Sequence, residues 1–237
     1  DTSNVKRTTK TLFSGVKIVW TEKHDSLPRL KEGDVIRIKQ IGRLETGQVF
    51  ESWKEIGRAP SICLGYKMAV EGWELGLYEM AVGEKAKISI PSELAYGKQG
   101  FGAIIPPNSD LIYEVEIVEN IQPVVLEGGV QVYTLERTKK SKANTDLTDK
   151  EISFGYASFV KGKGMYDNSY KSGSVFKYTY GKPTVVPGLN IAIPEIRIKD
   201  KSYVKIPAKL AYGKKGLTDF VPPNSDILYD IMLVDIK

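Results

Sequence analysis

Few side chains in this sequence could carry acid–base, nucleophilic or metal-dependent chemistry. The chain has one histidine, His24, in a polar stretch, and one cysteine, Cys63, in a short apolar run. A Cys/His metal cluster and a Ser-His-Asp triad are therefore excluded as its working chemistry. A single cysteine also rules out a disulfide within the chain, so we expect Cys63 to be an inert core thiol. We predict no metal and no cofactor.

Phosphate and nucleic-acid chemistry are also disfavoured. The glycines at 97, 100 and 102 lack the spacing of a phosphate-binding loop and precede no helical pattern, so we predict a flexible loop there. The 34 basic and 29 acidic residues are interspersed along the chain. That pattern is typical of a solvated surface and gives only a weak, salt-sensitive attraction to nucleic acid or anionic membranes.

Nothing in the sequence predicts insertion into a membrane. No apolar stretch approaches the roughly 20 residues needed to span a bilayer. Residues 1–13 are polar and basic, without the apolar centre of a signal peptide. We therefore expect a flexible N-terminal tail at 1–13 and a cytoplasmic location, with the nucleus as the second choice.

The aromatic residues concentrate in blocks that occur twice. The motifs Leu-Ala-Tyr-Gly-Lys, at 94–98, and Pro-Pro-Asn-Ser-Asp, at 106–110, both recur 116 residues later. The same shift pairs two further aromatic positions, Phe50 with Tyr166 and Tyr113 with Tyr229. Such constant spacing predicts two copies of one domain. We place the linker at 122–127, where Pro123 interrupts the strand pattern.

Short alternating apolar runs predict that each copy is mainly antiparallel sheet. A helical stripe of Ala69, Trp73, Leu77 and Met80 predicts one helix packed on that sheet, which is an α+β domain. The matching stretch of the second copy, 184–196, contains two prolines, and an interior proline costs about 3 kcal/mol, so its helix should be short or irregular. The clearest predicted strands are 35–41, 85–90, 111–117, 152–160 and 227–234.

Four motifs at ordered spacing identify a family. Val-Glu-Gly-Trp at 70–73, Leu-Ala-Tyr-Gly at 94–97, Ile-Ile-Pro-Pro at 104–107 and Phe-Glu-Ser at 50–52 together resemble the FKBP immunophilins, the tacrolimus- and rapamycin-binding peptidyl-prolyl isomerases. The resemblance covers nearly all of residues 14–121 and is weaker over 128–237. It implies two tandem FKBP-like domains with those bounds, each a twisted antiparallel sheet wrapped around one short helix, the first catalytic and the second degenerate.

The activity implied by this resemblance suits a chain with one histidine and one cysteine. Rotation about an X-Pro bond crosses a barrier of roughly 18–20 kcal/mol set by amide resonance, and no covalent bond or proton need move. The planar amide has separated charge that water stabilises, whereas the twisted amide has less. An apolar aromatic pocket can therefore favour the transition state over the ground state.

The resemblance also assigns roles in the first copy. Trp73 would form the pocket floor, and Tyr96 would donate a hydrogen bond to a ligand carbonyl. Each aromatic residue taken alone would be read as core, and only the co-occurrence of the motifs favours a site. The remaining predicted site residues are the walls Phe50 and Tyr113, the acid Glu51, the rim Val70, Ile104 and Ile105, and the flap residue Phe101.

Each copy departs from the family pattern at different positions. In the first, Gln40 replaces a tyrosine that is usual in the family, Glu51 replaces an aspartate, Pro60 replaces an aromatic residue and Ile56 replaces a polar one. The second keeps the tyrosine, aspartate and aromatic residue but has a leucine floor, so we expect a shallower or collapsed pocket with weak or no activity. Its predicted pocket residues are Tyr156, Tyr166, Asp167, Phe176, Val186, Leu189, Tyr212, Phe220 and Tyr229.

Three functions remain open at this point. The first is a prolyl isomerase acting on proline-containing protein clients and binding tacrolimus or rapamycin. The second is a non-catalytic FKBP-like binding or co-chaperone scaffold. The resemblance also implies a chaperone partner, recruited through a tetratricopeptide tail outside this chain. A nucleic-acid-binding immunophilin is the third and least favoured, because it rests only on the sequence pI of 9.0 and lysine-rich loops.

Overall fold

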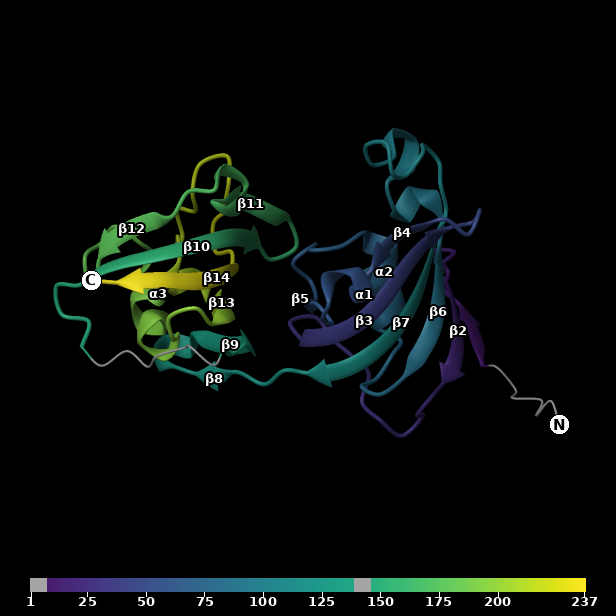
Figure 1. The fold of residues 1–237 in the computed structure, drawn as a ribbon, viewed down its shortest axis with the longest axis horizontal. Coiled ribbons are helices and arrows are strands. Elements are labelled where there is room, and N and C mark those ends of the chain that lie inside the picture. Colours follow the sequence, from purple (N-terminus) through teal and green to yellow (C-terminus); the bar gives the residue numbers. More distant parts are fainter. Residues whose placement is uncertain (1–7, 139–145) are drawn as a thin grey trace. The chain divides into compact units, whose positions relative to one another are not determined.

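The computed structural model describes residues 8–138 and 146–237, and the chain divides into two compact units (Figure 1). The units are Asp1–Asn120 and Ile121–Lys237. Each contains one antiparallel sheet, a short α-helix against the sheet and its own apolar core. The predicted α+β class is confirmed for both copies.

The sheet of the first unit has seven strands in the order β1-β2-β6-β7-β3-β4, with β5 also paired to β3. Its helices are α1 (Trp53–Ile56) and α2 (Glu71–Leu77), and short 3-10 turns lie at Ser92–Leu94 and Gly97–Gln99. The strands are β1 (Thr9–Thr11), β2 (Lys17–Glu22), β3 (Val35–Leu44), β4 (Val49–Ser52), β5 (Ser61–Cys63), β6 (Lys85–Ile90) and β7 (Leu111–Asn120).

The second unit repeats this topology with the order β11-β10-β14-β13-β9-β8, and β12 also pairs with β10. Its α-helix is α3 (Pro187–Ala192), followed at once by a 3-10 turn, Ile193–Glu195. The other short turns are Glu127–Gly129, Tyr170–Ser172 and Ala208–Leu210. The strands are β8 (Val124–Val125), β9 (Gln131–Glu136), β10 (Glu151–Val160), β11 (Gly164–Asn168), β12 (Phe176–Thr179), β13 (Lys201–Ile206) and β14 (Ile227–Ile236).

Each sheet includes a strand that precedes the predicted start of its domain, residue 14 or residue 128. Strands β1 and β8 pair with β2 and β9, so part of the predicted tail, 1–13, and part of the predicted linker, 122–127, belong to the sheets. The same tight turn closes both hairpins: Leu12 N–H donates to the Val16 carbonyl, as Leu126 N–H donates to the Val130 carbonyl. Residues 1–7 lie outside the described residues.

The helix of each copy lies very close to the sheet because glycines face it. A Cβ added to Gly72 would lie 2.3 Å from the Ile90 side chain, and one added to Gly188 would lie 2.3 Å from Ile206. Helix α2 is shorter than the predicted stripe, since the backbone of Val70 is extended and the helix ends at Leu77. As predicted, α3 is short: Pro187 occupies its first turn and Pro194 lies in the 3-10 turn after it.

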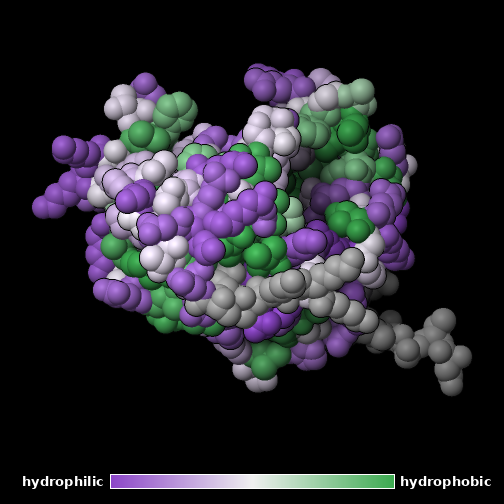
Figure 2. Space-filling view, turned by 60° about the vertical axis from the view of Figure 1, so that its left-hand side comes forward, coloured by the Kyte–Doolittle hydropathy of each residue, from purple (hydrophilic) through white to green (hydrophobic). Residues whose placement is uncertain are grey.

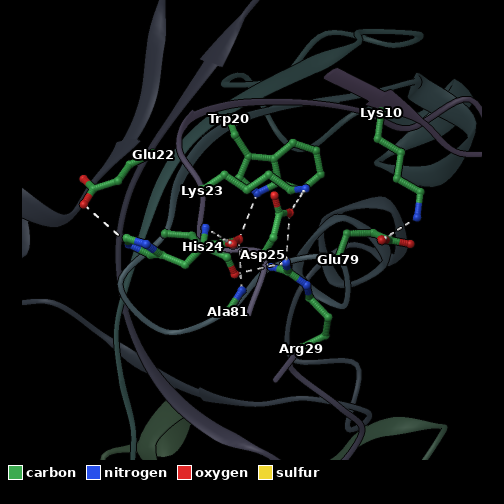
Figure 3. Close-up of polar contacts among 10 residues, drawn as sticks. Lys10, Trp20, Glu22, Lys23, His24, Asp25, Arg29, Glu79 and Ala81 are labelled. Atoms are coloured by element: carbon green, nitrogen blue, oxygen red, sulfur yellow. Dashed lines mark hydrogen bonds and ion pairs between the residues drawn. The ribbon is translucent and has the colours of Figure 1, made fainter. Parts of the chain in front are cut away.

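A buried carboxylate fastens the long connection between β2 and β3 to the rest of the first sheet. Glu84 is fully buried and accepts hydrogen bonds from Trp20 Nε1 (2.9 Å), His24 N (2.8 Å), Arg29 Nη1 (2.6 Å) and Ala81 N (3.1 Å). Figure 3 labels these four donor residues. Burial opposes its ionisation, but these hydrogen bonds outweigh burial and lower the pKa of Glu84.

The second copy repeats this anchor at the equivalent position with a shorter acid. Asp200 is buried, and Arg137 Nε lies 3.2 Å from its carboxylate. Thr138 N–H donates to it at 3.4 Å, as His24 N–H does to Glu84. The buried acid is therefore an element of the repeated fold.

The described surface mixes charged and apolar side chains. Figure 2 shows hydrophilic and hydrophobic residues interspersed over the face that it draws. No helix within residues 8–138 and 146–237 is long and apolar enough to cross a membrane. The same residues contain no group of three or more His, Cys, Asp or Glu side chains that could hold a metal ion.

Replacing Glu84 by glutamine should destabilise the first domain by roughly 3 kcal/mol, because Arg29 and buried N–H groups lose their carboxylate. The loss should show in urea unfolding. Since the pKa of Glu84 is lowered, its contribution is present above the ordinary value of 4.5 and disappears as the pH falls through the lowered one. The control is Glu79→Gln, in the more exposed pair with Lys10, which should cost about 1 kcal/mol or less. Equal losses in the two variants would contradict the anchoring role.

Candidate functional sites

The first domain has a pocket of about 340 Å³ between the sheet and the N-terminal end of α2. Trp73, only 2% exposed, contributes to its lining from the first turn of the helix. Of the predicted residues, the pocket brings together Trp73, Tyr96, Tyr113, Glu51 and Val70. Its full lining is Ile38, Gln40, Glu51, Ile56, Pro60, Ser61, Ile62, Met68, Ala69, Val70, Trp73, Tyr96 and Tyr113.

The predicted aromatic wall is layered. The ring centroids of Trp73 and Tyr113 lie 6.0 Å apart, and Phe50 meets Tyr113 edge-on at 5.6 Å. Phe50 is not among the residues that line the pocket. It packs over Gly42, where an added Cβ would lie 2.6 Å from the Phe50 ring. Phe50 therefore supports Tyr113 from beside the pocket, which differs from the direct wall that the sequence predicted.

The polar corner of the pocket contains two of the four residues that depart from the family pattern. Gln40 Nε2 donates to Glu51 Oε1, and Tyr113 Oη lies 3.5 Å from Glu51 Oε2. In the second domain Tyr156 Oη donates to Asp167 Oδ2 at 2.5 Å. The shorter Gln40 is thus matched by the longer Glu51, and the same hydrogen bond forms between different residue types.

The two tyrosines of this pocket remain protonated at neutral pH. Burial, then the nearby Glu51 carboxylate, raises the pKa of Tyr113, and the same two causes raise that of Tyr96. Both phenols therefore keep their hydrogen-bond donors. Two buried polar atoms, Trp73 Nε1 and Gln40 Oε1, have no hydrogen-bond partner within the described chain.

The predicted flap residues do not line the pocket. Phe101 is 54% exposed and stacks obliquely on Tyr96, with centroids 5.1 Å apart. Ile104 is also exposed, whereas Ile105 is buried in the core. The backbone N–H groups of Phe101 and Ile105 each donate a hydrogen bond to the carbonyl of the other residue. Neither Ile104 nor Ile105, the predicted rim, is among the residues that line the pocket, and the loop that carries them folds on itself. Gly100, at φ +64°, lies so close to the Ile105 carbonyl that a Cβ would meet it at 2.3 Å.

The second domain has a pocket of about 380 Å³ in the equivalent place. The predicted collapse is not found, since this volume is no smaller than that of the first pocket. Two of the nine predicted residues are not in its lining: Tyr166 packs against Tyr212 with centroids 6.3 Å apart, and Phe220 is exposed on the flap. The lining is Phe154, Tyr156, Asp167, Phe176, Pro183, Thr184, Val185, Val186, Pro187, Leu189, Ala211, Tyr212 and Tyr229.

The pocket does not collapse around its leucine floor because the large side chain lies on the strand in this domain and on the helix in the first. Where the first domain has Ile38 on β3 and Trp73 on α2, the second has Phe154 on β10 and Leu189 on α3. Phe154 is 1% exposed and its ring lies 5.3 Å from that of Phe176. The large aromatic ring therefore comes from the strand in the second domain.

Sequence reasoning missed several lining residues besides Phe154. Ile38 and Ile62 lie on strands, while Met68 and Ala69 lie in the turn before α2. The signal for the last two was their place beside the Val-Glu-Gly-Trp motif. Phe154 occupies the position of Ile38 in the repeat, and no motif marks either residue as part of a pocket.

Both halves of the chain match one protein-family model, that of the FKBP-type peptidyl-prolyl cis-trans isomerases. The match covers residues 28–118 and 142–234, which include both pockets. The chain therefore belongs to this family and contains two of its domains.

Curated relatives resemble the tandem arrangement and the single domain. Human peptidyl-prolyl cis-trans isomerase FKBP10 is 27% identical over 209 residues, which are 88% of this chain and 35% of that protein. Rat FKBP9 is 27% identical over 213 residues, 90% of this chain and 37% of that protein. The chain thus spans about a third of these relatives. FK506-binding protein 1 of Candida glabrata is 38% identical over 110 residues, 46% of this chain and 96% of that protein.

The contact between Gly42 and Phe50 gives a test of the layered wall. Gly42→Ala should push Phe50 and Tyr113 apart, cost about 1–3 kcal/mol of unfolding free energy by overpacking, and weaken ligand binding in the first pocket. Adding Phe50→Leu should recover much of the stability, because the smaller side chain leaves room for the new methyl group. Urea unfolding of the two variants measures this. No loss in Gly42→Ala would contradict the packing described.

Proposed function

We propose that the first domain is a peptidyl-prolyl cis-trans isomerase that acts on X-Pro bonds of protein clients. The observation that carries the proposal is Trp73 at an open pocket with Tyr113 and Tyr96 beside it. Membership of the isomerase family supports it. A catalytic metal is not part of the proposal.

The proposed mechanism is selective binding of the twisted amide. The proline ring enters the apolar pocket at Trp73, away from the water that stabilises the planar, charge-separated amide. The Tyr96 hydroxyl donates a hydrogen bond to a carbonyl of the bound chain. Each 1.36 kcal/mol by which the pocket favours the twisted over the planar form gives a tenfold rate increase. Glu51 and Gln40 bond to each other and fix the polar corner without moving a proton.

For the second domain we propose binding of proline-containing segments with weaker isomerase activity than the first. An open pocket of similar volume supports binding, and the strand-borne Phe154 offers a ring on which proline can pack. The leucine floor, in place of the tryptophan of the first pocket, supports a lower rate of isomerisation. The alternative for the whole chain is the non-catalytic binding or co-chaperone scaffold, in which both pockets hold partners and isomerisation is incidental.

Tacrolimus and rapamycin are the ligands that we propose for the first pocket, because both present a ring and carbonyls to such an apolar site. A cytoplasmic location and a chaperone partner bound through a tetratricopeptide tail outside this chain stay predictions. Nucleic-acid binding is not part of the proposal, and a salt titration of binding to an oligonucleotide would test it.

The catalytic assignment can be tested with Trp73→Leu, which gives the first pocket the floor residue of the second. We expect kcat/KM for a short X-Pro peptide to fall about tenfold or more, the effect of losing ~1.4 kcal/mol of transition-state preference. The matched control is Leu189→Ala in the second pocket, which should change the rate little. Rapamycin should inhibit the parent chain. If Trp73→Leu kept its full activity and rapamycin did not inhibit it, the catalytic site would have to lie elsewhere in the chain. A parent chain without activity would favour the non-catalytic binding scaffold.

The placement of the large side chain on the strand predicts a reciprocal result in the second domain. Phe154→Ile alone should remove its aromatic ring and weaken binding of a proline peptide there, with a loss of about 1–3 kcal/mol of stability from the cavity left behind. The double variant Phe154→Ile, Leu189→Trp should restore binding, because it recreates the Ile38 and Trp73 pair. Amide NMR shifts around Tyr229 would report binding in this domain alone. Equal binding by parent and single variant would contradict the role of Phe154.

A further inference from the structure

A buried carboxylate that the proposed mechanism does not use lies directly after Trp73. Glu74, on α2, is 8% exposed. Its Oε2 accepts a hydrogen bond from Gly65 N–H at 3.0 Å, and Tyr78 Oη lies 3.5 Å away. Its other oxygen, Oε1, is buried and has no hydrogen-bond partner within residues 8–138 and 146–237. A buried acid in this state is costly and calls for an explanation.

The hydrogen bond from Gly65 connects the pocket floor to the pocket wall. Gly65 begins the turn between β5 and α2, and the end of that turn contributes Met68, Ala69 and Val70 to the lining. The turn is tight, with Gly65 at φ +86° and Lys67 at φ +48°. Because Glu74 neighbours Trp73 on the helix, its carboxylate fixes the wall segment relative to the floor.

The second domain makes the same connection with a neutral amide. At the equivalent position Asn190 Oδ1 accepts from Gly181 N–H at 3.2 Å and from Tyr178 Oη at 3.0 Å. Its Nδ2 donates to the Lys182 carbonyl at 3.4 Å. The amide therefore uses both of its polar ends, and it cannot titrate. The group that binds the turn can therefore change its charge in the first copy and not in the second.

The groups that face Glu74 have opposing effects on its ionisation. Burial raises the pKa of Glu74, the hydrogen bonds from Gly65 and Tyr78 oppose the rise, and Glu32 and Lys67 add a weak repulsion and attraction. Burial and the negative charges of Glu74 and Glu32 raise the pKa of Tyr78 to about 12, with a small contribution from Cys63.

We propose that Glu74 is a positioning residue for the first pocket, where its ionised carboxylate holds the 65–70 wall segment against the helix and makes prolyl-ligand binding depend on pH. The inference rests on the proposed function of that pocket. When Glu74 is protonated, the bond from Gly65 loses its charge assistance and the wall loosens. The second pocket, fastened by Asn190, has no such dependence.

This role predicts opposite pH trends for folding and for binding. A raised pKa means that the folded state holds the proton more tightly, so stability falls as the pH rises from 4.5 through the raised value. Ligand affinity of the first pocket rises over the same interval, because ionisation fixes the wall. A merely structural acid would change the stability without changing the affinity.

The test is rapamycin binding to the full chain between pH 5 and pH 8, compared with Glu74→Gln. We expect the parent's Kd at the first pocket to rise about fivefold toward pH 5, close to 1 kcal/mol, and that of Glu74→Gln to stay constant. Gln is matched to the amide of Asn190, so folding should be kept. In the same samples the Gly65 amide NMR signal should follow the Glu74 titration without ligand, and only in the parent.

The reciprocal variant Asn190→Asp should give a new pH dependence to signals around Gly181. A Glu74→Gln profile that matches the parent, or a Gly65 signal that does not titrate, would overturn the positioning role alone. Absence of rapamycin binding at every pH would overturn the proposed function of the pocket and this role with it.

Discussion

The close contact of a glycine-bearing helix with the sheet is the constraint on which both domains depend. Gly72 and Gly76 lie against the side chains of Ile90 and Ile88, at distances that leave no room for a Cβ. Gly188 makes the same contact with Ile206 in the second domain. Any larger residue would lift the helix off the sheet and with it the floor of the pocket. Side-chain size on the helix and on the facing strands then sets the shape of each pocket.

The two domains show that the pocket is maintained by pairs of residues that change together. The aromatic ring lies on the helix as Trp73 in one copy and on the strand as Phe154 in the other. The polar corner is formed by Gln40 with Glu51 in one and by Tyr156 with Asp167 in the other. A single position is therefore a poor guide to whether a pocket of this family is open.

Much of the fold could be predicted because the repeat gave two readings of each element. The main strands, the α+β class and the short second helix follow from local patterns, and the family resemblance placed Trp73 at the pocket. Strands β1 and β8 were missed, since two or three residues carry no periodicity.

The pocket was only partly predicted. Phe50 and Ile105 lie beside it instead of in its lining, because strand register and the flap turn decide which side chains face a cavity. Phe154 was missed, since a buried aromatic residue on a strand looks like any core residue.

Exchange NMR on a short X-Pro peptide tests the central claim most directly, because it detects rotation and the site in one sample. With a small amount of the chain present, we predict cis–trans exchange cross-peaks at rates far above the uncatalysed isomerisation, which takes tens to hundreds of seconds. The indole N–H signal of Trp73 should shift as peptide is added. Exchange at the uncatalysed rate, or catalysis without any change at Trp73, would contradict the account.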